Sequence, residues 1–201
     1  MLETMDIQEH ILLNSFKLFL MNNFEKVTIE QIEQESGFTR RTLYRHFGGK
    51  EKLFINVCDH FILRTQDIEE KIPEVEDMEN FYGFIMKYII GIKKVMSKMY
   101  GFGIENIYKY YFFLIMQANI YYPDFTDKVT ELNNKEYQKW ETELSKAIKN
   151  KEIKEEVDIK LTALQFRNIF LGMSFEKSLT DGLDVDLLLR TYLNIYNQIK
   201  L

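Results

Sequence analysis

Apolar residues recur at intervals of three and four along most of the chain, which is the spacing of one face of an α-helix. Near the N-terminus this face contains Ile11, Phe16 and Phe19. No run of alternating apolar and polar residues lies between turn residues, so the pattern contains no strand signal. The sequence therefore predicts an all-α fold.

Three short helices are predicted in the first fifty residues, spanning about 6–21, 28–35 and 39–46. Thr28 and Thr39 stand where a side chain caps the second and third helices, since a threonine hydroxyl accepts hydrogen bonds from the free amides of a first helical turn. Gly37 between these two helices allows a sharp turn. The start of the chain therefore predicts a compact three-helix unit.

The remainder of the chain predicts a second, larger helical domain. A longer helix of residues about 50–70 connects the two parts, and Pro73 with the acidic residues after it follows that helix. Further helices are predicted near residues 78–97, 103–121, 124–150, 158–179 and 184–200. We therefore expect two domains, residues 1–50 and residues 51–201.

A basic segment occupies residues 37–53 of a 201-residue chain whose net charge is −5. Its cations are Arg40, Arg41, Arg45, Lys50 and Lys52, and its one anion is Glu51. On charge alone, such a cluster is most simply a solvated helix face. Two short helices joined by a glycine turn, the second of them basic, also form a helix-turn-helix, which binds DNA by placing its second helix in the major groove.

The residue types in this segment suit both parts of DNA recognition. The fork of an arginine matches the O6 and N7 acceptors of guanine. Small hydroxyls, a tyrosine, a histidine and a lysine suit phosphate contacts, which position a protein without reading sequence. This combination favours a DNA-binding helix over a solvated face.

Residues 7–57 resemble the tetracycline-repressor (TetR) family of bacterial regulators. The resemblance depends on Phe16 and Phe19, on the sequence VTIEQI, and on the motifs Gly37-Phe38-Thr39, Thr42-Leu43-Tyr44, His46-Phe47 and Gly49-Lys50-Glu51-Lys52-Leu53. It implies a helix-turn-helix domain in residues 1–50 and a helical effector-binding and dimerisation domain in residues 51–201.

The resemblance also implies roles for single residues. The positions matching base contacts are Thr39, Arg40, Arg41 and Arg45. The positions matching phosphate contacts are Thr28, Thr42, Tyr44, His46 and Lys50. Phe38, Leu43 and Phe47 match core positions that hold the two helices together.

Three positions depart from the family pattern, and one of them, Asn23 in place of the usual glycine before Phe24, is a mild change. Arg41 stands where the family often has glycine or a small residue, which implies a wider or rotated base readout. Glu33 stands where the family usually has alanine. Its carboxylate either extends outward or pairs with a nearby arginine.

The segment of residues 101–125 is apolar on nearly all sides of its predicted helix, which indicates burial. It is either a central core helix or a helix that lines a cavity for a small apolar or amphipathic effector. The resemblance implies such a cavity in this half of the chain. Candidate lining residues are Tyr108, Tyr111, Phe112, Met116, Trp140 and Phe170.

The last two predicted helices, residues about 158–179 and 184–200, have more apolar residues than one outer face needs. They are either buried within one protomer or packed against a second copy. The resemblance implies the second arrangement, a homodimer that spaces two recognition helices about one DNA turn, roughly 34–36 Å, apart.

Other chemistry has little support. The one cysteine, Cys58, excludes an internal disulfide, and His10, His46 and His60 lack metal-ligand spacing. No phosphate-binding glycine loop or dinucleotide fingerprint occurs, so we expect no enzyme, no cofactor and no metal site. The N-terminus lacks the features of a signal peptide, and the apolar run of residues 110–116 is too short to span a membrane. We expect a cytoplasmic protein without a membrane partner.

The prediction is a ligand-responsive transcriptional regulator, and specifically a repressor. It binds a near-palindromic double-stranded operator as a dimer through the helix at 39–46, and a small molecule in the C-terminal domain releases or repositions it. The alternative is a helical protein–protein interaction module whose basic patch docks an acidic partner.

Overall fold

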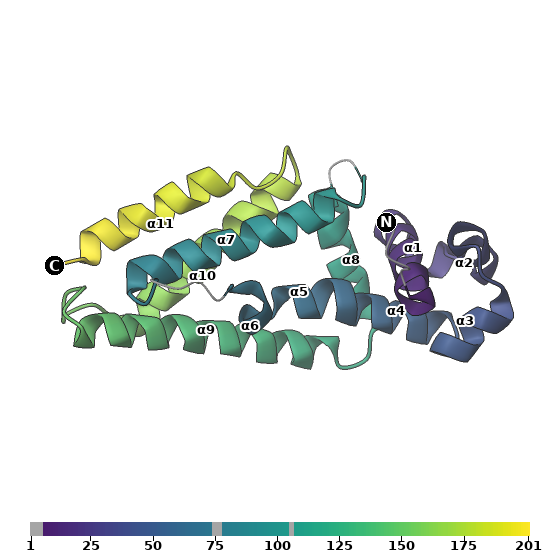
Figure 1. The fold of residues 1–201 in the computed structure, drawn as a ribbon, viewed down its shortest axis with the longest axis horizontal. Helices are drawn as coiled ribbons and strands as arrows, with labels where there is room; N and C mark the ends of the chain where they lie inside the picture. Colours follow the sequence, from purple (N-terminus) through teal and green to yellow (C-terminus); the bar gives the residue numbers. More distant parts are fainter. Residues whose placement is uncertain (1–5, 74–77, 105–106) are drawn as a thin grey trace. The chain divides into compact units, whose positions relative to one another are not determined.

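The computed structural model describes residues 6–73, 78–104 and 107–201, except for the side chain of Tyr108. The described residues form helices and no β-strand, and an isolated antiparallel bridge joins Ile153 and Lys200. The helices, in chain order (Figure 1), are α1 (Ile7–Met21), the 3₁₀-helix η1 (Phe24–Lys26), α2 (Ile29–Ser36), α3 (Arg40–Phe47), α4 (Lys50–Cys58), the π-helix η2 (Asp59–Leu63), α5 (Arg64–Gln66), α6 (Ile68–Lys71), α7 (Phe81–Tyr100), α8 (Ile107–Tyr121), α9 (Phe125–Lys149), α10 (Ile159–Ser178) and α11 (Val185–Ile199). The predicted all-α fold is confirmed.

The contacts divide the chain into two compact units, each continuous in space but not in sequence. Unit 1 consists of residues 1–65 and 110–129, and unit 2 of residues 66–109 and 130–201. The predicted domain boundary near residue 50 divides the chain by sequence position, whereas the two units group residues by their contacts. Unit 1 therefore contains the N-terminal helices, and unit 2 contains α10 and α11.

Unit 1 is built around aromatic side chains of α1, α4 and η2. Phe16 stacks on Phe61 with 4.1 Å between ring centroids, and Phe19 meets Phe54 edge to face at 5.0 Å. All four of these rings are buried. Such pairs stabilise a core beyond the area they bury.

Residues far along the chain complete unit 1. The buried Gln117 side chain accepts a hydrogen bond from the backbone N–H of Phe24 at 2.5 Å and donates one to the carbonyl of Phe19 at 3.1 Å. Because a buried amide must be paired, these two bonds hold α8 against the end of α1. Nothing in the local sequence around Gln117 indicates this role.

The prediction of one helix over residues 50–70 is wrong, because this stretch is not one regular helix. The helix α4 passes through the π-helix η2 into α5, and α6 begins anew at Asp67, whose side chain accepts a hydrogen bond from the N–H of Glu69 at 3.0 Å. A π-turn adds a residue to the helical turn and shifts the face that follows. No glycine or proline lies there, so the sequence has no local signal for the change.

Unit 2 has one aromatic core, in which α7 packs against α11 and α11 against α10 (Figure 1). Trp140 of α9 is fully buried and stacks on Phe166 of α10 at 4.6 Å between ring centroids. Tyr88 of α7 and Tyr192 of α11 contact the same indole ring. The fluorescence of Trp140 should therefore respond to the packing of α7, α9, α10 and α11.

Candidate nucleic-acid interface

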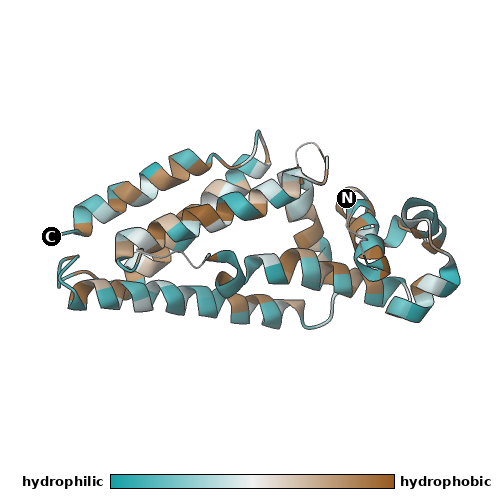
Figure 2. Cartoon of the chain, viewed as in Figure 1, coloured by the Kyte–Doolittle hydropathy of each residue, from teal (hydrophilic) through white to brown (hydrophobic). Residues whose placement is uncertain are grey.

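The turn between α2 and α3 takes the conformation that the sequence predicts. Gly37 ends α2 in the left-handed region with φ of +71°, which costs glycine little because it has no Cβ. The Thr39 hydroxyl then accepts from the N–H of Thr42 at 3.4 Å and caps α3. Leu43 and Phe47 are buried, so the opposite face of α3 is open to solvent. Figure 2 shows that α3 is coloured largely on the hydrophilic side of the scale.

All four predicted base-contacting residues are exposed, namely Thr39, Arg40, Arg41 and Arg45. Two of these arginines have close polar neighbours. Arg40 pairs with Glu30 and Glu33 of α2, and Arg45 Nη2 lies 3.2 Å from His46 Nε2. The four residues therefore share one solvent-exposed surface at the start and outer face of α3.

The predicted phosphate-contacting residues belong to the same unit as α3. Thr28 forms a capping box with Gln31, in which its hydroxyl accepts from the Gln31 N–H at 3.2 Å. Tyr44 is half exposed, and Thr42 lies one turn into α3 from its cap.

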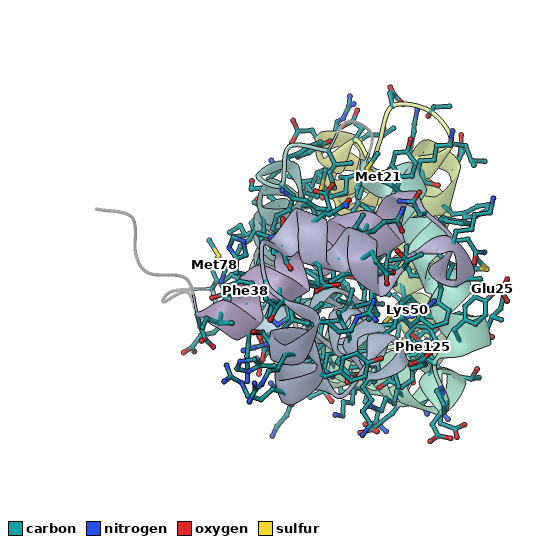
Figure 3. The ribbon with its side chains drawn as sticks, turned by 90° about the vertical axis from the view of Figure 1, so that its right-hand side faces the viewer. Met21, Glu25, Phe38, Lys50, Met78 and Phe125 are labelled. Carbon is teal, nitrogen blue, oxygen red and sulfur yellow. The ribbon has the colours of Figure 1, made fainter. Side chains whose placement is uncertain are left out.

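His46 and Lys50 already have partners within the protein. His46 Nδ1 lies 3.2 Å from Gln8 Nε2, and Lys50 Nζ donates to the carbonyls of Phe24 and Val27, each at 3.1 Å. Lys50 is labelled in Figure 3. Contact of each of these residues with DNA stays a prediction.

The predicted cavity residues do not form one cluster within either unit. Tyr111, Phe112 and Met116 belong to unit 1, whereas Trp140 and Phe170 belong to unit 2. The side chain of Tyr108 lies outside the part of the chain that the structure describes. The effector-binding role of this set stays a prediction.

The surroundings of these residues differ. Tyr111 donates to the carbonyl of Phe61 at 3.3 Å, Met116 is 59% exposed and Trp140 is fully buried. Phe112 is partly buried in α8, and Phe170 packs on the core of unit 2. Trp140 and Phe170 both approach Tyr88, at 5.1 and 5.9 Å between ring centroids.

Unit 2 also contains a groove of about 950 Å³, lined by residues of α6, α7 and α9 and sized like a small-molecule site. Its charged lining residues are Glu69, Glu79, Lys87, Lys135, Lys139, Glu143 and Lys146. None of the predicted cavity residues lines it. The sequence does not indicate these residues, because charged positions on amphipathic helices have the same pattern whether they line a groove or a flat surface.

Cys58 lacks the surroundings of a reactive thiol. Cys58 is fully buried, and burial, with the nearby Asp59 charge, raises the pKa of its thiol far above the usual range, so the nucleophilic thiolate does not form. Among the described residues, no three His, Cys, Asp or Glu side chains are grouped to hold a metal ion. No helix within those residues has the length and apolar character to cross a membrane.

Comparison with known proteins identifies the class of the chain. Residues 11–57 match the family described as bacterial regulatory proteins, tetR family. The chain is 31% identical over 67 residues to an uncharacterized HTH-type transcriptional regulator, YerO, of Bacillus subtilis (strain 168), covering 33% of this chain and 23% of that protein. It is 32% identical over 89 residues to the HTH-type transcriptional repressor NicS of Pseudomonas putida, covering 41% of this chain and 42% of that protein.

The match in fold extends over the whole chain. The crystal structure of a TetR-family transcriptional regulator from Agrobacterium tumefaciens superposes with a TM-score of 0.68, covering 97% of this chain and 98% of that one at 13% identity. The fold and the exposed basic helix thus define a helix-turn-helix protein with a larger helical unit. Residues 11–57 thus resemble the TetR family of bacterial regulatory proteins, and the chain as a whole shares the fold of a solved TetR-family regulator.

Proposed function

We propose that this protein is a dimeric transcriptional repressor that binds a near-palindromic operator and responds to a small molecule. The observation that carries the proposal is the exposed face of α3, where three arginines and two threonines follow a glycine turn. An α-helix fits the major groove, which is about 12 Å wide. The chain spans less than half the length of each of the two curated relatives. The proposal for the whole protein therefore rests on this site and not on those relatives.

The division of labour on this surface follows from its chemistry. Arg40, Arg41 and Arg45 have planar forks of N–H donors, and with Thr39 they read base edges. Thr28, Thr42, Tyr44 and His46 donate to phosphates and position α3, and Lys50 adds charge at the start of α4. The proposal includes that the protein binds DNA without acting as an enzyme and that it does so in the cytoplasm.

The proposed dimer uses α10 and α11. On α10 an exposed apolar stripe contains Leu161, Leu164, Leu171 and Phe175, which are between 38% and 58% exposed and lie on one side of the helix by their spacing. Leu187 of α11 is also 38% exposed. An apolar stripe of this length on a protomer marks an interaction site, and a two-fold copy of itself would cover it.

The proposed effector acts through the C-terminal helical domain, residues 51–201. A ligand shifts a conformational equilibrium only by its different affinities for the two states, and reversing a 99:1 balance takes about 5.5 kcal/mol. The ligand would favour a state in which the two recognition helices no longer match the half-site spacing. Its chemical class is a small apolar or amphipathic molecule.

The test is an electrophoretic shift with DNA from upstream of the protein's own gene, followed by selection from randomised duplexes. We expect a two-fold symmetric site with half-sites about 34–36 Å apart. Arg45→Ala should weaken binding to that site by roughly 1–3 kcal/mol and relax one base preference. Equal losses on the selected site and on random duplex would contradict base readout.

The same experiment separates the alternative function. A protein–protein module with a basic docking patch would select no sequence and show no effect of operator symmetry. Sedimentation equilibrium on the free protein gives a second result, because the proposal requires a dimer. A protein that stays monomeric with and without DNA would contradict it.

A further inference from the structure

Two carboxylates of α2 hold the first arginine of α3. The Glu33 carboxylate accepts a hydrogen bond from the backbone N–H of Arg40 at 2.5 Å through Oε1, and its Oε2 lies 3.7 Å from Arg40 Nε. Glu30 Oε1 accepts from Arg40 Nη2. Glu30 and Glu33 are three residues apart on α2 and therefore share one face. Arg40 is thus held at both its backbone and its side chain by the neighbouring helix.

The position of these carboxylates on the guanidinium group has a consequence for base reading. Nε and Nη2 form the side edge of the group, and both carboxylates lie along that edge. The end edge retains one hydrogen of Nη1 and the outer hydrogen of Nη2. A bidentate contact with the O6 and N7 of guanine needs two such donors. The geometry therefore leaves Arg40 one paired set of donors for a base.

The net charge of Arg40, Glu30 and Glu33 also favours a contact with a base over a contact with a phosphate. Arg40 with Glu30 and Glu33 carries a net charge of −1, which repels phosphate oxygens. The pKa of Glu30 is lowered by a hydrogen bond from its own backbone and, in spite of some desolvation, by the charge and hydrogen bond of Arg40, so this carboxylate is ionised at neutral pH. A phosphate contact would be weakened by two nearby carboxylates, whereas a neutral base edge with two acceptors would not.

We propose that Glu33 and Glu30 are positioning residues that set the base preference of Arg40, by limiting its guanidinium to an end-on contact with guanine and by lowering its affinity for phosphates. This inference rests on the proposed DNA-binding function. A flexible arginine has many rotamers that reach phosphates of any sequence. Ordering its side chain on binding costs free energy. An arginine already held by two carboxylates is oriented before DNA arrives.

The test uses the full chain and the same selection from randomised duplexes, and then measures affinities by fluorescence anisotropy at one salt concentration. Arg40→Ala identifies the base pair that Arg40 reads. Glu33→Gln keeps an oxygen that can accept from the Arg40 N–H, so it removes the charge and leaves the start of α3 capped. Glu30→Gln removes the second charge. Glu35→Gln is the matched control, since it removes the same charge from an exposed position of α2.

We expect the wild-type protein to prefer guanine at the Arg40-dependent position by about tenfold or more. The doubly substituted Glu30→Gln, Glu33→Gln protein should keep a preference of about threefold or less there and bind random duplex more tightly, because two charges that repel phosphates are gone. Glu35→Gln should leave the preference unchanged. In the Arg40→Ala background, Glu33→Gln should not alter base preference further. Circular dichroism confirms that each variant is folded.

Two results would overturn the inference while the proposed function stands. One is an unchanged guanine preference in the doubly substituted protein. The other is a Glu33→Gln effect at a base pair that Arg40→Ala leaves intact, which would mean that Glu33 contacts DNA itself, for example at the amino group of cytosine. If the wild-type protein selects no sequence, the proposed function fails first and this inference with it.

Discussion

Lys50 begins α4 with its ammonium group turned toward the backbone of unit 1. Nζ donates to the carbonyls of Phe24 and Val27 and lies 4.4 Å from the centroid of the Phe24 ring. These contacts satisfy two carbonyl groups in the connection between α1 and α2. The TetR resemblance implies a phosphate contact for Lys50, which stays a prediction, whereas its contacts within the protein required the structure.

Lys50→Ala should lower the free energy of unfolding by about 1–3 kcal/mol, because two partly buried carbonyls lose a charged donor. Urea unfolding followed by far-ultraviolet circular dichroism measures this change. Lys52→Ala is the control, since Lys52 is exposed and two positions along the same helix, and it should change stability by no more than about 0.5 kcal/mol. Equal effects of the two substitutions would show that the Lys50 contacts contribute no stability.

At the scale of elements, the contact between α6 and α7 in unit 2 depends on a glycine. A Cβ added at Gly91 of α7 would lie 2.1 Å from the carbonyl oxygen of Lys71 and 2.9 Å from its carbonyl carbon. Backbone atoms cannot rotate away as the end of a side chain can, so α6 approaches α7 this closely only at a residue without a side chain. The sequence shows the glycine inside a helical pattern, but the segment it faces is known only from the fold.

Gly91→Ala should therefore destabilise unit 2 by about 1–3 kcal/mol, although alanine is the better helix former. The fluorescence of Trp140, the single tryptophan, follows unfolding of this unit in urea. Gly172→Ala is the matched substitution on α10, where the added Cβ meets no atom of the protomer within 4 Å. It should stabilise the protomer by about 0.5–1 kcal/mol, and the same loss at both positions would contradict the steric argument.

At the scale of the whole molecule, unit 2 buries ionisable groups among its aromatic rings. Glu136 accepts a hydrogen bond from the Tyr88 hydroxyl at 2.5 Å and lies 3.8 Å from Lys71 Nζ and 3.5 Å from Arg167 Nε. Lys71, Glu136 and Arg167 are each less than 10% exposed. Buried ion pairs are weak evidence for stability, but they make stability depend on which groups are charged.

Alkaline pH should destabilise the protein. Burial first, and then the charge of Glu136, raises the pKa of Tyr88 and Tyr192 well above the ordinary value. Their contribution to stability is complete below the unfolded pKa of about 10 and is lost as pH rises above it. Burial instead lowers the pKa of Lys71, so its effect on stability rises with pH up to the unfolded lysine pKa of about 10.4 and stays constant above it.

We therefore expect the free energy of unfolding, measured by Trp140 fluorescence in urea, to fall as pH rises above about 10.5. Tyr192→Phe removes one of the two tyrosine hydroxyls and should reduce that slope by up to about 1.4 kcal/mol per pH unit. The comparison uses slopes, because loss of the hydrogen bond from Tyr192 to the Phe166 carbonyl lowers stability at every pH. An identical slope in both proteins would contradict this account.

The sequence alone determined the all-helical fold, the turn at Gly37, the caps at Thr28 and Thr39 and the exposed arginines of α3. These features depend on helical periodicity and on neighbours within a few residues, which a sequence displays directly.

Only the tertiary structure decided which distant groups meet. It brought Gln117 to α1, the carbonyls of Phe24 and Val27 to Lys50, and the carboxylates of α2 to Arg40. Such contacts depend on the packing of whole helices, and the spacing of residues along the chain does not encode the distance between them.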